Sequence, residues 1–150
     1  MSEIKQYVIF SLDEEMYGIE ILKIKEVVSY QKITPIPNTK GFVRGIINLR
    51  GVIVPVFDLR EKFNLPQTTY NRFYIIIVME ISGRVMGVIV DEISDVMELF
   101  PEEVQDASNL PPGIRAEYIK AIGKKEDGLT ILLDVDRLMS LEELEILDGT

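Results

Sequence analysis

The side chains of this sequence that are suited to chemistry are carboxylates. The chain has 150 residues and contains neither histidine nor cysteine. This absence excludes Ser-His-Asp and Cys-His nucleophilic machinery and zinc sites built on imidazole or thiolate. Aspartate and glutamate can still work as acid and base or hold Mg²⁺. The acidic positions to consider are Asp13, Glu14, Glu15, Asp91, Glu92, Asp95, Glu102, Glu103, Asp134 and Asp136.

Each acidic group also fits a structural role. The acidic triplet that begins at Asp13 lies between two strand-like runs, which is typical of a solvated hairpin turn. Glu102 and Glu103 follow Pro101 and suit the first turn of a short helix. Asp134 and Asp136 alternate with apolar residues, as on the solvent face of a strand. We therefore expect no catalytic residue and no metal site. No phosphate-binding glycine motif is present, so we expect no cofactor.

The stretch GIINLRGVIVPVFDLR, 45–60, contains an arginine that a turn does not require. Asn48 and Gly51 are turn residues between two apolar runs, and Leu49 suits an anchor in the core. Arg50 has two readings. It either forms a surface salt bridge, or it offers a fixed fork of donors to a carboxylate or carbonyl of a partner. We favour the second, because a rigid turn loses little entropy on binding.

Composition narrows the range of partners. The formal net charge is −9 and the sequence pI is about 4.6, so phosphate backbones and anionic membrane surfaces would be repelled. The N-terminus lacks the pattern of a signal peptide, and the apolar runs are too short to span a membrane. Absence of cysteine agrees with a reducing compartment. These features predict a soluble cytoplasmic protein with no nucleic-acid partner and no membrane insertion.

Short β-strands dominate the predicted secondary structure. Runs at 6–12 and 16–24 form a hairpin, 22–30 continues as a strand, and 34–42 is a proline-broken connector with a helix-start option at Asn38. The runs at 43–49 and 52–59 form a second pair. Pro55 lies within it and predicts an edge strand or a bulge. A helical turn is expected at 58–65, and Ser140 with Glu143 indicates a capped C-terminal helix over 140–149.

The pattern then repeats. A shift of 69 residues places Gly18 on Gly87, Ile24 on Ile93 and Val27 on Val96. This predicts a mainly β fold of two similar five-stranded barrels, because closing a barrel removes free strand edges. The expected lobes are 14–75 and 76–150. Whether the strand at 6–12 is exchanged between the lobes stays open.

The string EEMYGIEILKIKEVVSYQKITPIPNTKGFVRGIINLRGVIVPVFDLR closely resembles the CheW family of bacterial chemotaxis coupling proteins. The likeness continues through GRVMGVIVDEISDVMEL and EYIKAIGKKEDGLTILLDVDRL, so it covers nearly the whole chain as one CheW-like domain, 1–150. It implies two SH3-like barrels packed together and a non-enzymatic adaptor. Proteins of this family couple the cytoplasmic tips of chemoreceptors to the histidine kinase CheA, and the localisation implied is at membrane-bound receptor arrays.

The resemblance also implies which residues make the contacts. Gly45 and Asn48 would support Arg50 in the receptor-binding surface, and Gln105 stands where better-known relatives would have a basic residue. From the residues alone, the aliphatic members are equally suited to a barrel core. The implied receptor-binding residues are Ile24, Glu26, Val27, Gly45, Asn48, Arg50, Ile75, Ile93 and Val96. The residues implied to contact the C-terminal regulatory domain of CheA are Gln105 and Leu110.

Two rival functions remain. The first is a coupling protein of the same family in a sensory array outside chemotaxis. The second belongs to another class, a carboxylate-based hydrolase or a small-ligand β-barrel. That second rival predicts converging carboxylates in a deep pocket.

Overall fold

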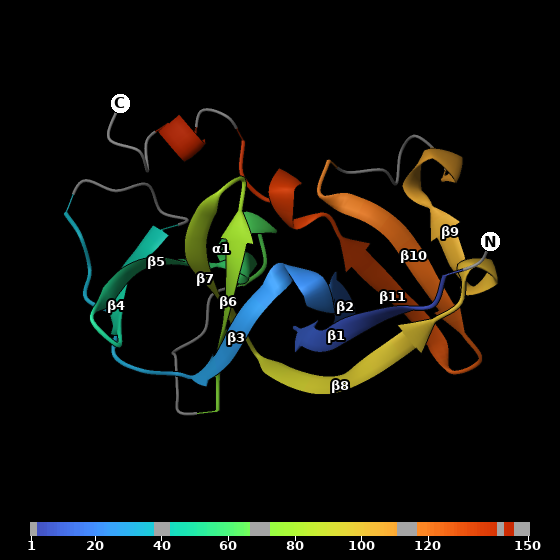
Figure 1. Ribbon diagram of the computed structural model, residues 1–150, viewed down its shortest axis with the longest axis horizontal. Helices are drawn as coiled ribbons and strands as arrows, with labels where there is room; N and C mark the ends of the chain where they lie inside the picture. The colour runs from blue at the N-terminus through green and yellow to red at the C-terminus, as the bar shows by residue number, and fades with distance from the viewer. Residues whose placement is uncertain (1–2, 38–42, 67–72, 111–116, 141–142, 146–150) are drawn as a thin grey trace.

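Two β-sheets account for most of the structure. The computed structural model describes residues 3–37, 43–66, 73–110, 117–140 and 143–145. Within these residues eleven strands form the two sheets, one on each side of the view in Figure 1. The mainly β fold with short helices, predicted from the sequence, is confirmed.

The first sheet contains five of the described strands. Its order is β3-β6-β7-β5-β4. Neighbouring strands run antiparallel except for β5 and β7, which are parallel. The bounds are β3 Ile24–Ser29, β4 Val43–Leu49, β5 Val52–Asp58, β6 Ile75–Ile81 and β7 Arg84–Val90. A short helix, α1 (Leu59–Lys62), follows β5, as expected from the sequence.

The second sheet contains six described strands, one more than predicted. Its order is β8-β1-β2-β11-β10-β9, and β2 and β11 are parallel. The bounds are β1 Lys5–Leu12, β2 Glu15–Glu20, β8 Glu92–Leu99, β9 Val104–Asp106, β10 Ile119–Lys125 and β11 Gly128–Leu133. The 3₁₀ turns are η1 (Ile21–Lys23), η2 (Pro101–Glu103), η3 (Ala107–Asn109) and η4 (Val135–Arg137).

The sheets do not follow the expected division at residues 75 and 76. The hairpin β1–β2 pairs with β8 in the second sheet, and the hairpin β6–β7 pairs with β3 in the first. Each sheet therefore combines the first hairpin of one repeat with the later strands of the other repeat. Only a 3₁₀ turn separates β2 from β3, and Asp91 alone separates β7 from β8. At both junctions the chain crosses from one sheet to the other. The exchange of strands between the lobes is therefore reciprocal, and it includes more than the strand at 6–12.

Equivalent glycines mark the repeat in three dimensions. Gly18 pairs with Leu132 in the parallel contact of β2 with β11, and Gly87 pairs with Val56 in that of β7 with β5. A Cβ atom at Gly18 would lie 2.9 Å from Leu132 Cδ2, and one at Gly87 would lie 3.2 Å from Val56 Cγ2. Both glycines thus allow the close approach of the paired strands.

Three clusters of buried side chains form the core. One lies within the first sheet and includes Ile76 and Val78, and another lies within the second and includes Tyr7 and Ile9. The third draws on strands of both sheets and lies between the lobes. Alternate residues of β6 enter different clusters, with Ile77 between the lobes. Burial on both faces explains why the sequence of β6 is almost continuously apolar.

Pro55 lies in an internal strand, so of the two predicted settings, an edge strand or a bulge, the edge strand is wrong. The β4–β5 pair does contain a register irregularity, between Val43 and Gly45 of β4 and opposite Phe57 and Val56. The strand β5 pairs with β4 on one side and with β7 on the other. Pairing with β7 covers only Val56–Asp58, so Pro55 stands just before that ladder begins. The missing N–H of proline is tolerated because that side of the strand is unpaired at position 55.

The C-terminal helix is capped as predicted. The Glu143 amide donates to Ser140 Oγ at 3.1 Å, and the Ser140 amide donates to Glu143 Oε1 at 2.8 Å. Leu144 is buried in the cluster between the lobes, so at this position the helix docks on the protein. Two further leucines of the predicted helix, Leu141 and Leu147, and the helix-start position Asn38 lie outside the described residues.

A buried arginine ties the two lobes together. Arg60 of α1 is 5% exposed and donates from Nε to Asp91 Oδ1 at 3.0 Å and from Nη2 to Asp91 Oδ2 at 2.6 Å. Its Nη1 also donates to the Pro66 carbonyl at 2.8 Å and lies 3.6 Å from Asp13 Oδ1. Asp91 joins β7 to β8, and Asp13 lies in the β1–β2 turn. Arg60 therefore connects the first lobe to two segments of the second.

We expect Arg60→Met to lower the free energy of unfolding by about 2–3 kcal/mol, because it leaves the Asp91 carboxylate without its paired cation. Urea denaturation measures this change. Arg137→Met is the control, since Arg137 is exposed and, within the described part of the chain, its ion pair is with Asp134 of its own turn. Equal stabilities of the two variants would contradict a locking role for Arg60.

Candidate interaction surfaces

The turn around Arg50 has a fixed geometry. Asn48 Oδ1 accepts a hydrogen bond from the Gly51 amide at 2.7 Å. Arg50 and Gly51 both have positive φ, +53° and +86°, which the tight turn between β4 and β5 requires. Leu49 packs against the core cluster of the first sheet. Asn48, Leu49 and Gly51 thus serve the turn, as the sequence indicated, while the Arg50 side chain is 70% exposed.

Arg50 forms an ion pair with Glu26, another residue of the implied receptor-binding set. Arg50 Nη1 donates to Glu26 Oε1 at 3.2 Å, and Arg50 Nη2 contacts Glu26 Oε2, so the pair is bidentate. Glu26 lies on β3 and Arg50 follows β4, the strands at opposite ends of the first sheet. The hydrogen bond from Arg50 holds the pKa of Glu26 below its usual range. The pair therefore spans the seam where this sheet curls into a barrel.

Gly45 has a structural role at the same seam. It is buried, and a Cβ atom at this position would lie 2.1 Å from the Thr34 carbonyl oxygen. Next to it, Thr34 and Ile46 exchange backbone hydrogen bonds of 2.9 Å. Gly45 thus allows the connector after β3 to close on β4.

The aliphatic residues of the implied set fall into two groups. Ile24, Ile75 and Ile93 are half-buried and pack against the cluster between the lobes. Val27 on β3 and Val96 on β8 are 43% and 47% exposed. These two valines occupy equivalent positions in the repeat, on the strands that diverge from the centre of Figure 1. Exposed valines of this kind are available to a partner, whereas the three isoleucines mainly serve the core.

The implied kinase-binding residues lie on the second lobe. Gln105 belongs to β9, where it pairs with Ile122 of β10, and its Nε2 donates to the Asn109 carbonyl at 3.4 Å. Leu110 follows η3 and is half-buried. Gln105 and Leu110 thus share one short segment at the end of the second sheet. The structure brings these two together and places Arg50 on the other sheet.

Several candidate catalytic carboxylates have structural roles, and among these Asp13 and Asp91 lie together. Asp13 and Asp91 surround Arg60, and Glu103 accepts a hydrogen bond from the Phe100 amide at 2.9 Å, as a capping glutamate does. The predicted strand face of Asp134 and Asp136 is wrong. Asp134 caps η4, and Asp136 accepts from the Ser82 amide at 2.9 Å, because the chain turns directly after β11.

Among the described residues, no three carboxylates gather closely enough to hold a metal ion. In the same part of the chain, no helix has the length and apolar character needed to span a membrane.

Comparisons with known proteins all indicate the same protein family. The model of the CheW-like domain family matches residues 6–143. The chemotaxis protein CheW of Klebsiella aerogenes is 39% identical over 145 residues, which cover 97% of this chain and 87% of that protein. The CheW of Treponema pallidum is 36% identical over 144 residues, covering 93% and 85%. The crystal structure of the scaffolding protein TtCheW from Thermoanaerobacter tengcongensis matches with a TM-score of 0.84 at 34% identity, covering 94% and 96%.

The two-sheet fold and the near-complete family match lead to one conclusion: the chain belongs to the CheW-like domain family. The resemblance inferred from the sequence is confirmed.

Sequence reasoning missed the role of Arg60. Its signal was present in the DLR end of the quoted stretch, where an arginine follows an apolar strand and a helix-capping aspartate. Asp58 Oδ1 indeed accepts from the Arg60 amide at 2.8 Å. The partner Asp91 lies 31 residues further along, and local patterns do not report such a contact.

We expect Arg50→Ala to raise the pKa of Glu26 toward that of an ordinary glutamate, because the hydrogen bond that stabilises its charged form is lost. In the native protein the stabilisation by this pair is present above the unfolded-state pKa. It is lost as the pH falls through the lower folded-state pKa. An NMR titration of the Glu26 carboxyl measures the shift. The control Arg137→Ala should leave it unchanged, and an unchanged Glu26 pKa in Arg50→Ala would refute the pairing in solution.

Proposed function

We propose that the chain is a non-enzymatic adaptor that couples the cytoplasmic tips of chemoreceptors to the histidine kinase CheA in bacterial chemotaxis. The observation that carries this proposal is the family match over residues 6–143, together with full-length relatives named as chemotaxis proteins and a structural relative named as a scaffolding protein. Its place in the cell would be the cytoplasm, at receptor arrays.

The proposed receptor-binding surface centres on Arg50. Its guanidinium is exposed, yet Glu26 and the rigid turn hold it in one orientation. A planar fork that is already oriented loses less entropy when it meets a carboxylate or carbonyl of a partner. Val27, next to Glu26 on β3, adds exposed apolar area. A receptor helix recognised here would bring a polar group to Arg50 and aliphatic side chains to the β3 face.

The proposed kinase-binding surface is the β9–η3 segment with Gln105 and Leu110. The contact is proposed to be with the C-terminal regulatory domain of the kinase. Gln105 carries no charge, so this contact would rest on hydrogen bonding and on the apolar side chain of Leu110. Since Arg50 and Leu110 belong to different lobes, one chain has room for both partners.

The rival within the family, coupling in a sensory array outside chemotaxis, would use the same surfaces. Genes for receptors and kinases next to the coding gene distinguish the two pathways. The hydrolase rival gains no support, because Asp13 and Asp91 pair with the Arg60 guanidinium, and Glu103 and Asp136 accept backbone hydrogen bonds elsewhere in the fold.

The adaptor proposal predicts selective loss of one partner per variant. Pull-downs use a receptor cytoplasmic fragment and the kinase regulatory domain as separate baits. We expect Arg50→Ala to weaken receptor binding roughly tenfold or more while kinase binding is kept. Leu110→Asp should do the reverse, because a carboxylate replaces an apolar contact.

The matched controls are Arg137→Ala and Leu129→Asp, which make the same changes at exposed positions outside both proposed sets of contact residues. Both should bind like the parent chain. Normal receptor binding by Arg50→Ala, or joint loss of both partners in either test variant, would show that the two surfaces are assigned incorrectly.

A further inference from the structure

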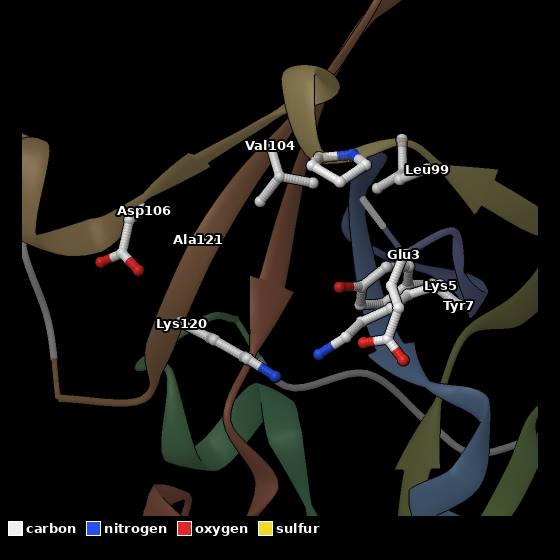
Figure 2. Close-up of a pocket in the computed structure, with 9 residues that line it drawn as sticks. Glu3, Lys5, Tyr7, Leu99, Val104, Asp106, Lys120 and Ala121 are labelled. Atoms are coloured by element: carbon white, nitrogen blue, oxygen red, sulfur yellow. The ribbon is translucent and has the colours of Figure 1, made fainter. Parts of the chain in front are cut away.

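A pocket of about 380 Å³ opens on the second lobe, where β1, β9 and β10 meet the end of β8. Its apolar floor includes Leu99, Val104 and Ala121, which belong to or pack against the core of this sheet. Its rim carries Glu3, Lys5, Lys120 and Asp106. Figure 2 shows the Lys120 side chain extending from β10 toward Lys5 and Tyr7. The pocket thus combines an apolar floor with a polar rim of both charges.

The repeat gives this pocket a counterpart in the first lobe. The shift of 69 residues aligns Tyr7 with Ile76, and these residues occupy the cores of their respective sheets. It also aligns Leu99 with Tyr30. The same shift aligns Lys5 with Tyr74, and the strand pairing agrees with this alignment. In the second lobe Leu99 pairs with Lys5, and in the first lobe the Tyr30 amide donates to the Tyr74 carbonyl at 3.1 Å.

The two lobes differ in what fills this place. In the first lobe Tyr74 is 9% exposed and belongs to the core cluster, with Tyr30 packed against it. In the second lobe the position of Tyr74 is taken by Lys5, whose side chain is 43% exposed. Leu99 replaces the ring of Tyr30. The second lobe therefore lacks aromatic rings at these two positions, although it has Tyr7 where the first lobe has Ile76. Lys5 and Leu99, the residues at the two positions, both line the pocket.

We propose that this pocket receives a tyrosine side chain presented by a protein partner. The ring would occupy the floor formed by Leu99, Val104 and Ala121, as Tyr74 occupies the core of the first lobe. Its hydroxyl would meet a rim that offers both donors and acceptors, which suits a phenol better than a charged group.

The charges on the rim are arranged for such a neutral polar guest. Glu20 Oε2 accepts from Lys120 Nζ at 3.2 Å, and Glu20 Oε1 lies 4.0 Å from Lys5 Nζ. Asp106 already accepts a hydrogen bond from the Ser108 amide at 2.9 Å. With both ammonium groups facing a carboxylate, neither an anion nor a cation is strongly favoured. The choice of a protein as the source of the tyrosine rests on the proposed adaptor function.

Lys5→Tyr tests the proposal, because it places in the second lobe the residue that the first lobe has at the same position. The probes are p-cresol, the analogue of the tyrosine side chain, and the peptide acetyl-Thr-Tyr-Thr-amide, each titrated into the ¹⁵N-labelled full chain. We expect amide shifts at Tyr7, Leu99 and Ala121 with both probes. In Lys5→Tyr both affinities should fall roughly tenfold or more, because the new ring occupies the pocket.

Lys25→Tyr is the matched control, since Lys25 is an exposed lysine on β3 of the other sheet. Both probes should bind it as they bind the parent chain, and they should also bind Lys5→Ala. Absent shifts in the parent chain, or equal binding by Lys5→Tyr and Lys25→Tyr, would overturn the proposal. Binding of p-cresol without the peptide would overturn its protein source. Neither receptor nor kinase is present in this titration, so its result is independent of the adaptor assignment.

Discussion

Burial of two β-hairpins on both faces is the constraint on which this structure depends. One face of each hairpin, β1–β2 and β6–β7, packs into the core of its own lobe. The other face packs against the opposite lobe. Because the hairpins also exchange their following strands, neither lobe is made from one continuous half of the chain. The Arg60–Asp91 pair strengthens this arrangement at the point where the chain crosses from one sheet to the other.

This arrangement leaves contacts to the periphery. The middle parts of the central strands are buried, so the side chains available to other molecules come from turns, from strand ends such as Val52 and Ile53 of β5, and from the outer strands β3, β8 and β9. Arg50 illustrates the consequence. The turn that carries it is fixed by Asn48 and Gly51, and its orientation is fixed by Glu26, yet most of its side chain is exposed. A rigid body with oriented groups at its edges is well suited to join partners.

Local patterns predicted the strands, turns and caps well, because those features depend on neighbouring residues. The hairpin turn at Asp13 and Glu14, the capping role of Glu143 and the turn chemistry of Asn48 are examples. The lobe boundaries were harder to predict. Strand exchange is decided by which hairpin packs against which sheet, and the repeated sequence is compatible with either choice. Pro55 was misplaced for a related reason, since a strand can be internal while part of one side is unpaired.

Side-chain partners at long range were not predictable from spacing. Glu26 and Arg50 were grouped by family resemblance, but their direct pairing depends on the first sheet curling until β3 approaches the β4–β5 turn. Likewise, the division of the aliphatic residues into the half-buried Ile24 and the exposed Val27 follows from the path of β3. These distinctions require the packed structure.

We propose that this chain couples receptor to kinase by binding alone. The decisive measurement is the receptor-dependent activity of CheA, reconstituted with receptor-containing vesicles in the presence and absence of the chain. We expect kinase activity to rise above its basal level and to respond to receptor ligand only when the chain is present. Equal receptor control of the kinase without the chain would rule out this role.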